Sequence, residues 1–162
     1  MKVLFVSDTY FPHVNGVYCF VKRLAVLLQE KGHETSVLAP SETIHGTQKM
    51  IDGLAVYGVP SMPIVIYPKI RFPIAFNLRA TVRRLILQLR PDVIHIQDHF
   101  LLAKVVVDVN KDFGIPIVGT NHFMPEKVTA LLPFNTFNKR FGKWMWSGFV
   151  KFFDQLEQVT PP

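Results

Sequence analysis

Short, continuously apolar runs alternate along the chain with longer runs in which apolar residues recur every three or four positions. The first apolar run, Val3–Val6, predicts a strand over Lys2–Ser7 that is covered on both faces. The next run keeps its apolar side chains on one helical face, so we predict a helix from Gly16 to Lys31, ended by a left-handed Gly32. This alternation is typical of βα repeats, which build a parallel sheet.

The same alternation continues toward the end of the chain. Further strands are predicted at Thr35–Leu38, Ala55–Val59, Ile64–Tyr67, Val93–Ile96, Ile117–Thr120 and from Val159. Helices are predicted at Ile74–Arg90 and Leu101–Phe113, the second capped by Gly114, and one or two more in the aromatic last third, interrupted near Pro133. The pattern predicts one Rossmann-like three-layer α/β/α domain over residues 1–162 with a central parallel sheet.

The composition is that of one ordinary domain from a reducing compartment. The chain has 162 residues, of which 49% are apolar and 19% charged, so it can bury a core. Its single cysteine, Cys19, has no partner for an internal disulfide. The N-terminus lacks the apolar run of an export signal, and no stretch approaches the ~20 apolar residues of a membrane span. We therefore predict a cytoplasmic protein that can lie peripherally on the inner face of the membrane.

The positive charge is concentrated in two stretches, which hold most of the 18 basic residues and give a net charge of +6. Basic residues beside an apolar helical face, or interleaved with aromatic ones, are typical of a helix that enters a lipid headgroup layer. The predicted membrane or lipid contacts are Arg71, Arg79, Arg83, Arg84, Lys139, Arg140, Lys143 and Trp144. The alternatives are a solvated basic edge on a core helix and an aromatic cluster that packs on another domain. Nucleic acid is disfavoured as a partner, because no recognition-helix, RRM or OB pattern occurs.

Polar residues gather where predicted strands end and helices begin, which is where ligands bind in open parallel sheets. Asn15-Gly16 opens the first helix, whose N-terminus suits a phosphate, and the missing side chain of Gly16 lets a ligand approach the backbone. The alternative is a simple turn with Asn15 as the N-cap. Neither G-x-G-x-x-G nor a P-loop occurs, which disfavours ordinary dinucleotide or NTPase binding.

Two histidine-containing segments follow later strands. His95, Asp98 and His99 have metal-binding side chains, but a strand that turns into a loop does not hold positions i and i+4 together as a helix does. A binding loop is therefore favoured over a metal site. His122 follows the strand at Ile117–Thr120, where functional residues gather in this architecture, although a lone histidine is more often a packed or surface residue.

Several short motifs, taken in order, resemble one known family. They are Val6-Ser7-Asp8-Thr9-Tyr10-Phe11-Pro12 through Asn15-Gly16-Val17, Leu24-Ala25, Lys31-Gly32-His33-Glu34, Arg90-Pro91-Asp92-Val93-Ile94-His95 and Gly119-Thr120-Asn121-His122. Their order and spacing resemble the N-terminal domain of family 4 glycosyltransferases across nearly the whole chain. The resemblance implies a GT-B fold, in which two Rossmann-like domains face each other across a cleft. It also implies sugar transfer from a nucleotide-sugar donor, with retention of configuration and no required metal or other cofactor.

The resemblance further implies roles for individual residues. Gly16 matches the glycine whose backbone lies near the donor diphosphate, and we assign Asn15 to the donor side with it. His122 matches the histidine that contacts the donor sugar at the reacting centre, so it is the implied catalytic residue. The residues on loops that match the acceptor side are Asp8, Tyr10, Asp98 and His99.

The family's second domain carries the main nucleotide site, with two glutamates separated by seven residues, and no counterpart follows Pro162. We therefore expect the acceptor-side half of an enzyme, which by itself binds nucleotide sugar weakly and transfers little or no sugar. Several members of the family glycosylate lipids, so a membrane lipid is the predicted acceptor. The competing hypothesis is a catalytically silent membrane- or partner-binding module on the same fold.

Overall fold

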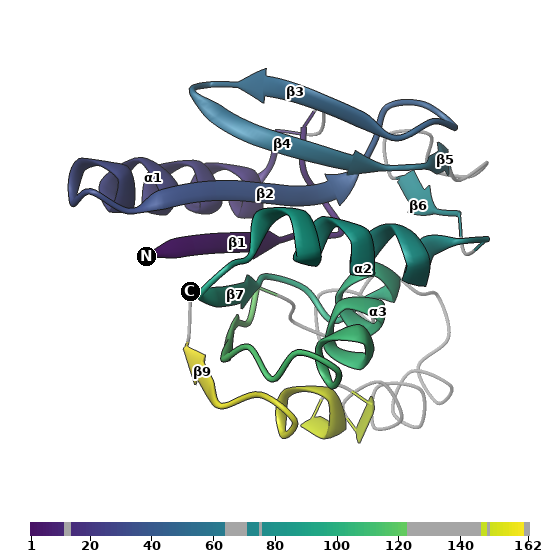
Figure 1. Cartoon of the computed structure of the whole chain (residues 1–162). Helices are drawn as coiled ribbons and strands as arrows, with labels where there is room; N and C mark the ends of the chain where they lie inside the picture. Colours follow the sequence, from purple (N-terminus) through teal and green to yellow (C-terminus); the bar gives the residue numbers. More distant parts are fainter. Residues whose placement is uncertain (12–13, 64–70, 75, 123–146, 149, 161–162) are drawn as a thin grey trace, which may run out of the picture.

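Helices lie on both faces of a central sheet in this computed structural model (Figure 1), which describes residues 1–11, 14–63, 71–74, 76–122, 147–148 and 150–160. The helices are α1 (Gly16–Glu30), α2 (Leu78–Leu89) and α3 (Leu101–Asn110). The expected strand at Ile64–Tyr67, the break near Pro133 and the predicted contacts Lys139, Arg140, Lys143 and Trp144 lie outside the described residues.

The main sheet has seven strands in the order β3-β4-β2-β1-β7-β8-β9. Its strands are β1 (Lys2–Val6), β2 (Glu34–Pro40), β3 (Thr47–Ile51), β4 (Leu54–Val59), β7 (Val93–Ile96), β8 (Ile117–Thr120) and β9 (Gln158–Thr160). Every neighbouring pair is parallel except β3 with β4, which is antiparallel. The predicted parallel sheet and three-layer α/β/α fold are therefore confirmed, with an antiparallel strand added at one edge.

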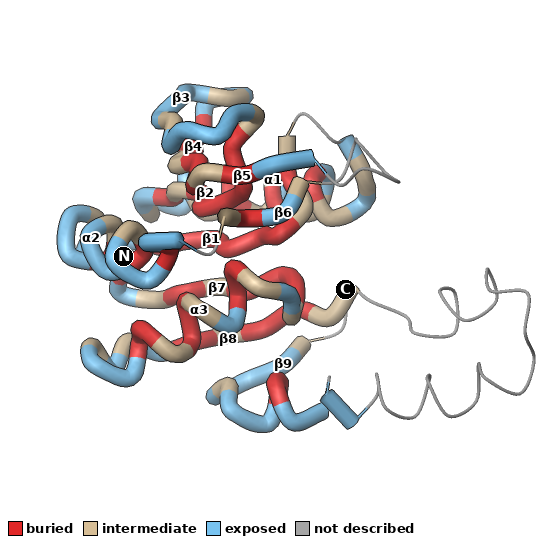
Figure 2. The backbone as a smooth tube through the Cα atoms, turned by 90° about the vertical axis from the view of Figure 1, so that its right-hand side faces the viewer, coloured by how far each residue is buried: buried red, intermediate tan, exposed pale blue. Residues whose placement is uncertain are grey.

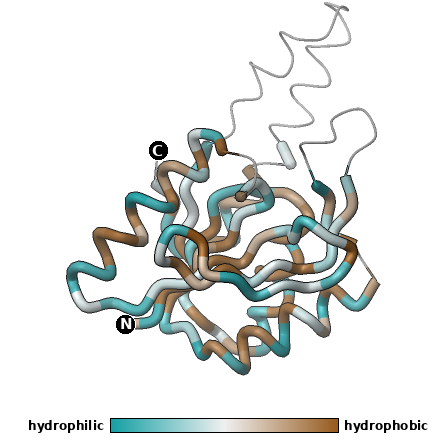
Figure 3. Tube along the Cα trace, turned by 90° about the horizontal axis from the view of Figure 1, so that it is seen from above, coloured by the Kyte–Doolittle hydropathy of each residue, from teal (hydrophilic) through white to brown (hydrophobic). Residues whose placement is uncertain are grey.

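The core consists of two apolar layers, one on each face of the sheet. On one face α1 packs through Val21 and Ala25 against Phe5 and Val37. On the other, α2 and α3 pack on the alternate side chains of the same strands, for example Leu4. Figure 2 shows the buried strands enclosed between the helices, and Figure 3 shows each helix alternating between hydrophobic and hydrophilic positions. Strands covered on both faces explain the continuously apolar runs in the sequence.

Three elements differ from the sequence-based expectation. The β3–β4 hairpin was not predicted, although Asp52-Gly53, with φ of 52° and 79°, is the turn dipeptide such hairpins prefer. The strands β5 (Ser61–Pro63) and β6 (Arg71–Pro73) form a second small sheet, so α2 begins at Leu78 rather than Ile74. Helix α3 ends at Asn110 rather than Phe113, and the backbone N–H of a left-handed Gly114 returns to the Asn110 carbonyl at 2.8 Å.

Candidate functional site

The strand order reverses between β1 and β7, and two buried carboxylates lie just beyond the ends of these strands. After β1 the chain moves outward to β2 and β4, whereas β7 leads to β8 on the other side. Such a switch point is where open α/β sheets form a ligand-binding crevice. Asp8 follows β1 and Asp98 follows β7, and both side chains are buried. The structure thus brings together two of the predicted acceptor-side residues.

Both carboxylates point into the protein and hold the loops of the switch point together. The Asp8 oxygens accept hydrogen bonds from the backbone N–H groups of Leu102 at 2.9 Å and Ala103 at 3.2 Å, which caps the N-terminus of α3. Asp98 Oδ2 accepts from the Ser7 hydroxyl at 3.0 Å and from the Asp8 N–H at 3.1 Å. In this chain the two side chains shape the crevice, and their contact with an acceptor stays a prediction.

Burial raises the pKa of Asp8 to about 7, against the lowering effect of the two α3 N–H donors. The nearby Asp98 charge also raises the pKa of Asp8, and Lys104 lowers it. Burial likewise raises the pKa of Asp98. The switch point therefore holds two carboxyl groups that the fold makes harder to ionise.

The raised pKa of Asp8 predicts that the chain loses stability as the pH rises from about 4 to about 7. In this window the folded chain retains a proton that the unfolded chain has released, so the free energy of unfolding falls with rising pH. We expect a loss of at most about 4 kcal/mol between pH 4 and pH 8 from this group. Urea denaturation at several pH values measures it. Asp8→Asn should flatten the slope, and an equal slope in the variant would contradict the assignment.

His122 is held by a glutamine that the sequence analysis did not single out. Its Nε2 lies 2.9 Å from Gln97 Oε1, and Gln97 is only 1% exposed. In this amide orientation Nε2 carries the proton and donates it to Gln97, which leaves the lone pair on Nδ1. Burial lowers the pKa of His122, so the ring is neutral near pH 7. The available signal was a polar residue at the end of a buried strand, between His95 and Asp98.

The N-terminal turn of α1 lies next to His122. The Phe20 ring packs edge-on against the His122 ring with centroids 4.8 Å apart, and Phe20 lies about one turn beyond Gly16 on α1. Asn15 is the N-cap, since its Oδ1 accepts from the Tyr18 N–H at 2.9 Å. Gly16 is exposed, and a Cβ built there would meet nothing within 4 Å. The structure therefore places both predicted donor-side residues and the predicted catalytic residue at one end of α1.

The remaining histidines are separated from each other by the strand geometry. His95 Nε2 lies 2.8 Å from Thr120 Oγ1, and burial lowers the pKa of His95 to about 4. The His99 ring stacks on Phe100 at 4.7 Å, and burial lowers its pKa to about 4 as well. Across the described ranges, no three His, Cys, Asp or Glu side chains are grouped as a metal site. His99 is only partly buried and is the predicted acceptor-side residue with the most exposed side chain.

Tyr10, the fourth predicted acceptor-side residue, is buried in the core beneath α1. Its ring packs against Tyr18 with centroids 5.0 Å apart, and burial raises its pKa. Its hydroxyl is buried and has no hydrogen-bond partner in the described part of the chain. Tyr18 itself donates to Asp52 in the β3–β4 turn, so this pair ties α1 to the edge hairpin.

Most of the described arginines predicted to contact lipid are engaged within the fold. Arg71 donates to the Ser61 hydroxyl at 2.8 Å and to the Ser61 carbonyl at 2.9 Å. Arg79 and Arg83 form ion pairs with Asp108 and Asp112 beside α3. Arg84 is exposed and forms no ion pair with another described residue. No helix in the described ranges is both long and apolar enough to cross a membrane.

The fold is that of one Rossmann-like half of a GT-B enzyme. It resembles the catalytic domain of starch synthase IV from Arabidopsis thaliana bound to ADP and acarbose, with a TM-score of 0.51 and 19% identity over 75% of this chain and 34% of that chain. It also resembles UDP-GlcNAc 2-epimerase from Methanocaldococcus jannaschii, with a TM-score of 0.57 and 9% identity over 100% of this chain and 39% of that chain. At these identities the likeness concerns the fold alone.

The chain belongs to glycosyltransferase family 4, because residues 14–161 match that family. A GDP-mannose-dependent alpha-mannosyltransferase of Mycolicibacterium smegmatis is 34% identical over 74% of this chain and 32% of its own length. An alpha-monoglucosyldiacylglycerol synthase of Streptococcus pneumoniae is 25% identical over 75% of this chain and 26% of its own length. The chain thus spans about a quarter to a third of these relatives and corresponds to their N-terminal part. The expected family resemblance is confirmed.

Proposed function

We propose that this chain is the acceptor-side domain of a retaining glycosyltransferase, in which α1 and His122 receive the donor. The observation that carries the proposal is the contact between the His122 ring and Phe20, with centroids 4.8 Å apart, which sets His122 beside the open first turn of α1. The exposed Gly16 begins that turn at the carboxyl edge of the sheet. A diphosphate bound at this turn would leave its attached sugar close to the His122 ring.

The chemistry asks these residues for positioning and charge stabilisation more than for a strong base. The leaving diphosphate gains from the N–H donors at the start of α1, which Gly16 leaves uncovered. A neutral His122, oriented by Gln97, holds the sugar through polar contacts and needs no proton from solvent. The proposal requires no metal. The nucleotide would be held mainly by a second Rossmann-like domain across the cleft, so this chain by itself should bind the donor weakly.

A membrane lipid is the acceptor class we propose, with the protein peripheral on the inner face of the membrane. Supporting it are the names of two relatives: alpha-monoglucosyldiacylglycerol synthase, and a phosphatidylinositol N-acetylglucosaminyltransferase chain of Arabidopsis thaliana, which is 29% identical over 75% of this chain. Among the described arginines the exposed Arg84 remains available for an anionic surface. The competing proposal, a silent binding module, needs the same fold but no donor contact.

A nucleotide-sugar titration of the 162-residue chain, followed by two-dimensional NMR, separates these proposals. UDP-glucose and GDP-mannose are the probes, and the transferase proposal expects shifts of the Gly16 and His122 signals with at least one of them. Gly16→Val should weaken this binding about tenfold, because its side chain covers the helix N–H groups. Gly148→Val, also at an open position, is the matched control. Absence of any shift at Gly16 and His122 with either probe would favour the silent module.

A further inference from the structure

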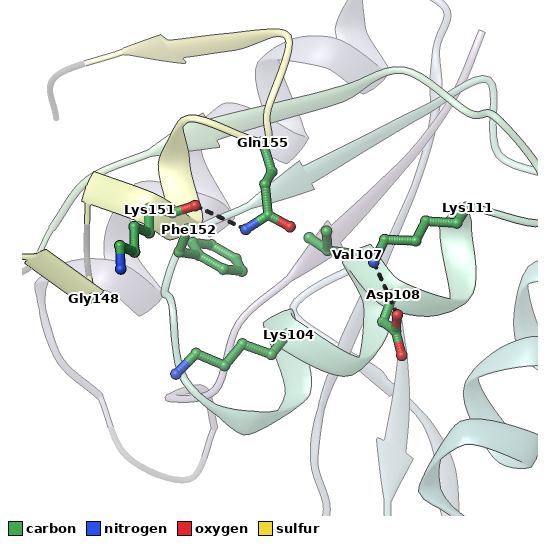
Figure 4. A pocket seen from close by; sticks show the side chains of 8 residues that line it. All are labelled: Lys104, Val107, Asp108, Lys111, Gly148, Lys151, Phe152 and Gln155. Atoms are coloured by element: carbon green, nitrogen blue, oxygen red, sulfur yellow. Dashed lines mark hydrogen bonds and ion pairs between the residues drawn. The ribbon is translucent and has the colours of Figure 1, made fainter.

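A pocket of about 260 Å³ lies between α3 and residues 148–155, apart from the His122 site. Figure 4 shows side chains from both segments facing each other across it. Three lysines surround it, Lys104 and Lys111 from α3 and Lys151 from the C-terminal segment. Val107 and Phe152 form an apolar wall between them. None of these five residues was assigned to the donor, the acceptor or the membrane.

The three lysines differ in how their charges are compensated. Lys111 Nζ lies 3.1 Å from Asp108 Oδ1, and Asp108 also pairs with Arg79. Lys104 and Lys151 are exposed, and neither has a carboxylate within 4.0 Å among the residues that the structure describes. Figure 4 places both of their ammonium groups on the same side of the pocket. The pocket therefore carries two uncompensated positive charges on one rim.

The size and the wall of the pocket limit what can fill it. A pocket of about 260 Å³ lies just below the usual range of about 300–1,000 Å³ for sites that enclose a drug-sized ligand, so a complete nucleotide sugar is too large. Val107 and Phe152 are 8% and 4% exposed, so what remains accessible of them is a small apolar surface at the base of the pocket. A ligand that fits has a compact anionic end and a short apolar part.

We propose that this pocket binds a phosphate ester that carries an apolar chain. The ammonium groups of Lys104 and Lys151 pair with the phosphate oxygens, as lysine does in many phosphate sites, and the chain lies against Val107 and Phe152. A phospholipid headgroup and a free alkyl phosphate share this chemistry. The proposal does not depend on sugar transfer, although Lys104 lies close enough to Asp8 to lower its pKa, so the pocket borders the switch point.

NMR titration of the 162-residue chain with three soluble probes tests the ligand class. The probes are inorganic phosphate, hexyl phosphate and monomeric dihexanoylphosphatidic acid. Hexyl phosphate is expected to shift the signals of Lys104, Val107 and Lys151 and to bind at least tenfold more tightly than inorganic phosphate, because buried methylenes add affinity. Tighter binding of the phosphatidic acid than of hexyl phosphate would indicate a lipid source, and the reverse a single-chain phosphate. Equal affinity for inorganic and hexyl phosphate, or shifts elsewhere only, would overturn the proposal.

Charge-matched variants distinguish the pocket from a general attraction of anions to a basic protein. Lys104→Gln and Lys151→Gln should each weaken hexyl phosphate binding about two- to fivefold, as expected for exposed ion pairs. Lys111→Gln loses the same charge from the same rim but from a lysine already paired with Asp108, and Lys31→Gln loses it at the end of α1. Both controls should bind as the parent chain does. Equal weakening in all four variants would leave only non-specific attraction and refute the site.

The pocket and the transferase proposal can fail separately. Loss of hexyl phosphate binding would leave the nucleotide-dependent shifts at Gly16 and His122 untouched. Conversely, a chain that ignores both nucleotide sugars can still bind hexyl phosphate through Lys104 and Lys151. All four substituted lysines are exposed, so their replacement should leave the thermal unfolding midpoint within a few degrees of the parent.

Discussion

Replacing His122 with alanine is expected to lower sugar transfer by about a hundredfold to ten-thousandfold. The ring lies beside the first turn of α1, where the donor sugar is proposed to sit, and Gln97 orients it. Alanine removes both the polar contact to the sugar and the donor that satisfies Gln97 Oε1. Transfer is measured with this chain joined to a donor-binding domain, using the nucleotide sugar that shifts the Gly16 signal.

Two variants show whether the loss comes from the His122 ring. His122→Gln retains a side-chain donor that can reach Gln97, so it should restore stability lost in His122→Ala without restoring transfer. His45→Ala removes an exposed histidine in the loop before β3 and should transfer sugar at the parent rate. Transfer by His122→Ala within threefold of the parent would remove His122 from the site.

Replacing Gly119 with valine is expected to reduce the free energy of unfolding by about 2–3 kcal/mol. Gly119 lies in the centre of β8, and a Cβ there would come within 2.6 Å of Leu156 Cδ1 and 2.9 Å of Phe153 Cε1. Leu156 can move its terminal methyl group, but the buried Phe153 ring is held against the sheet by the core on that face. The C-terminal segment must then shift away from β8 or the strand must distort.

Urea denaturation of the Gly119→Val chain measures this loss. Gly148→Ala is the matched control, because a Cβ at Gly148 meets nothing within 4 Å and its φ is not in the left-handed region. The control should be as stable as the parent or slightly more so. We also expect Gly119→Val to disturb residues 158–160, since β9 pairs with β8 through Gly119 and Val159. A midpoint equal to that of the parent would show that the close packing at Gly119 does not contribute to stability.

The predicted elements that proved correct are those with a strong local pattern. The apolar runs at Val3–Val6 and Val93–Ile96 became central strands, and the left-handed glycines at Gly32 and Gly114 follow helices as predicted. The β3–β4 hairpin was missed because β3 is a mostly exposed edge strand, with burial on neither face to impose a pattern. The short β5–β6 pair was missed because its strands have three residues each and contain prolines.

The candidate site divides in the same way. Asn15, Gly16 and His122 were found because each directly precedes a helix or follows a strand, which is visible along the chain. Gln97 was missed because its role depends on His122, 25 residues away, and only adjacent strands bring the two side chains within 2.9 Å. Pairing of Arg79 and Arg83 with carboxylates on or just after α3 was equally invisible, since it requires α2 and α3 to lie side by side.

The sequence by itself determined that this protein is a parallel α/β domain and which residues stand at the ends of its strands, because periodicity and turn residues act over a few positions. Only the tertiary structure decided which of those residues face one another. It turned Asp8 and Asp98 inward to cap α3 and join two loops, set His122 beside α1, and left Lys104 and Lys151 uncompensated around a pocket. Such contacts arise from segments distant in the chain, and their energies depend on burial and distance, which no local pattern records.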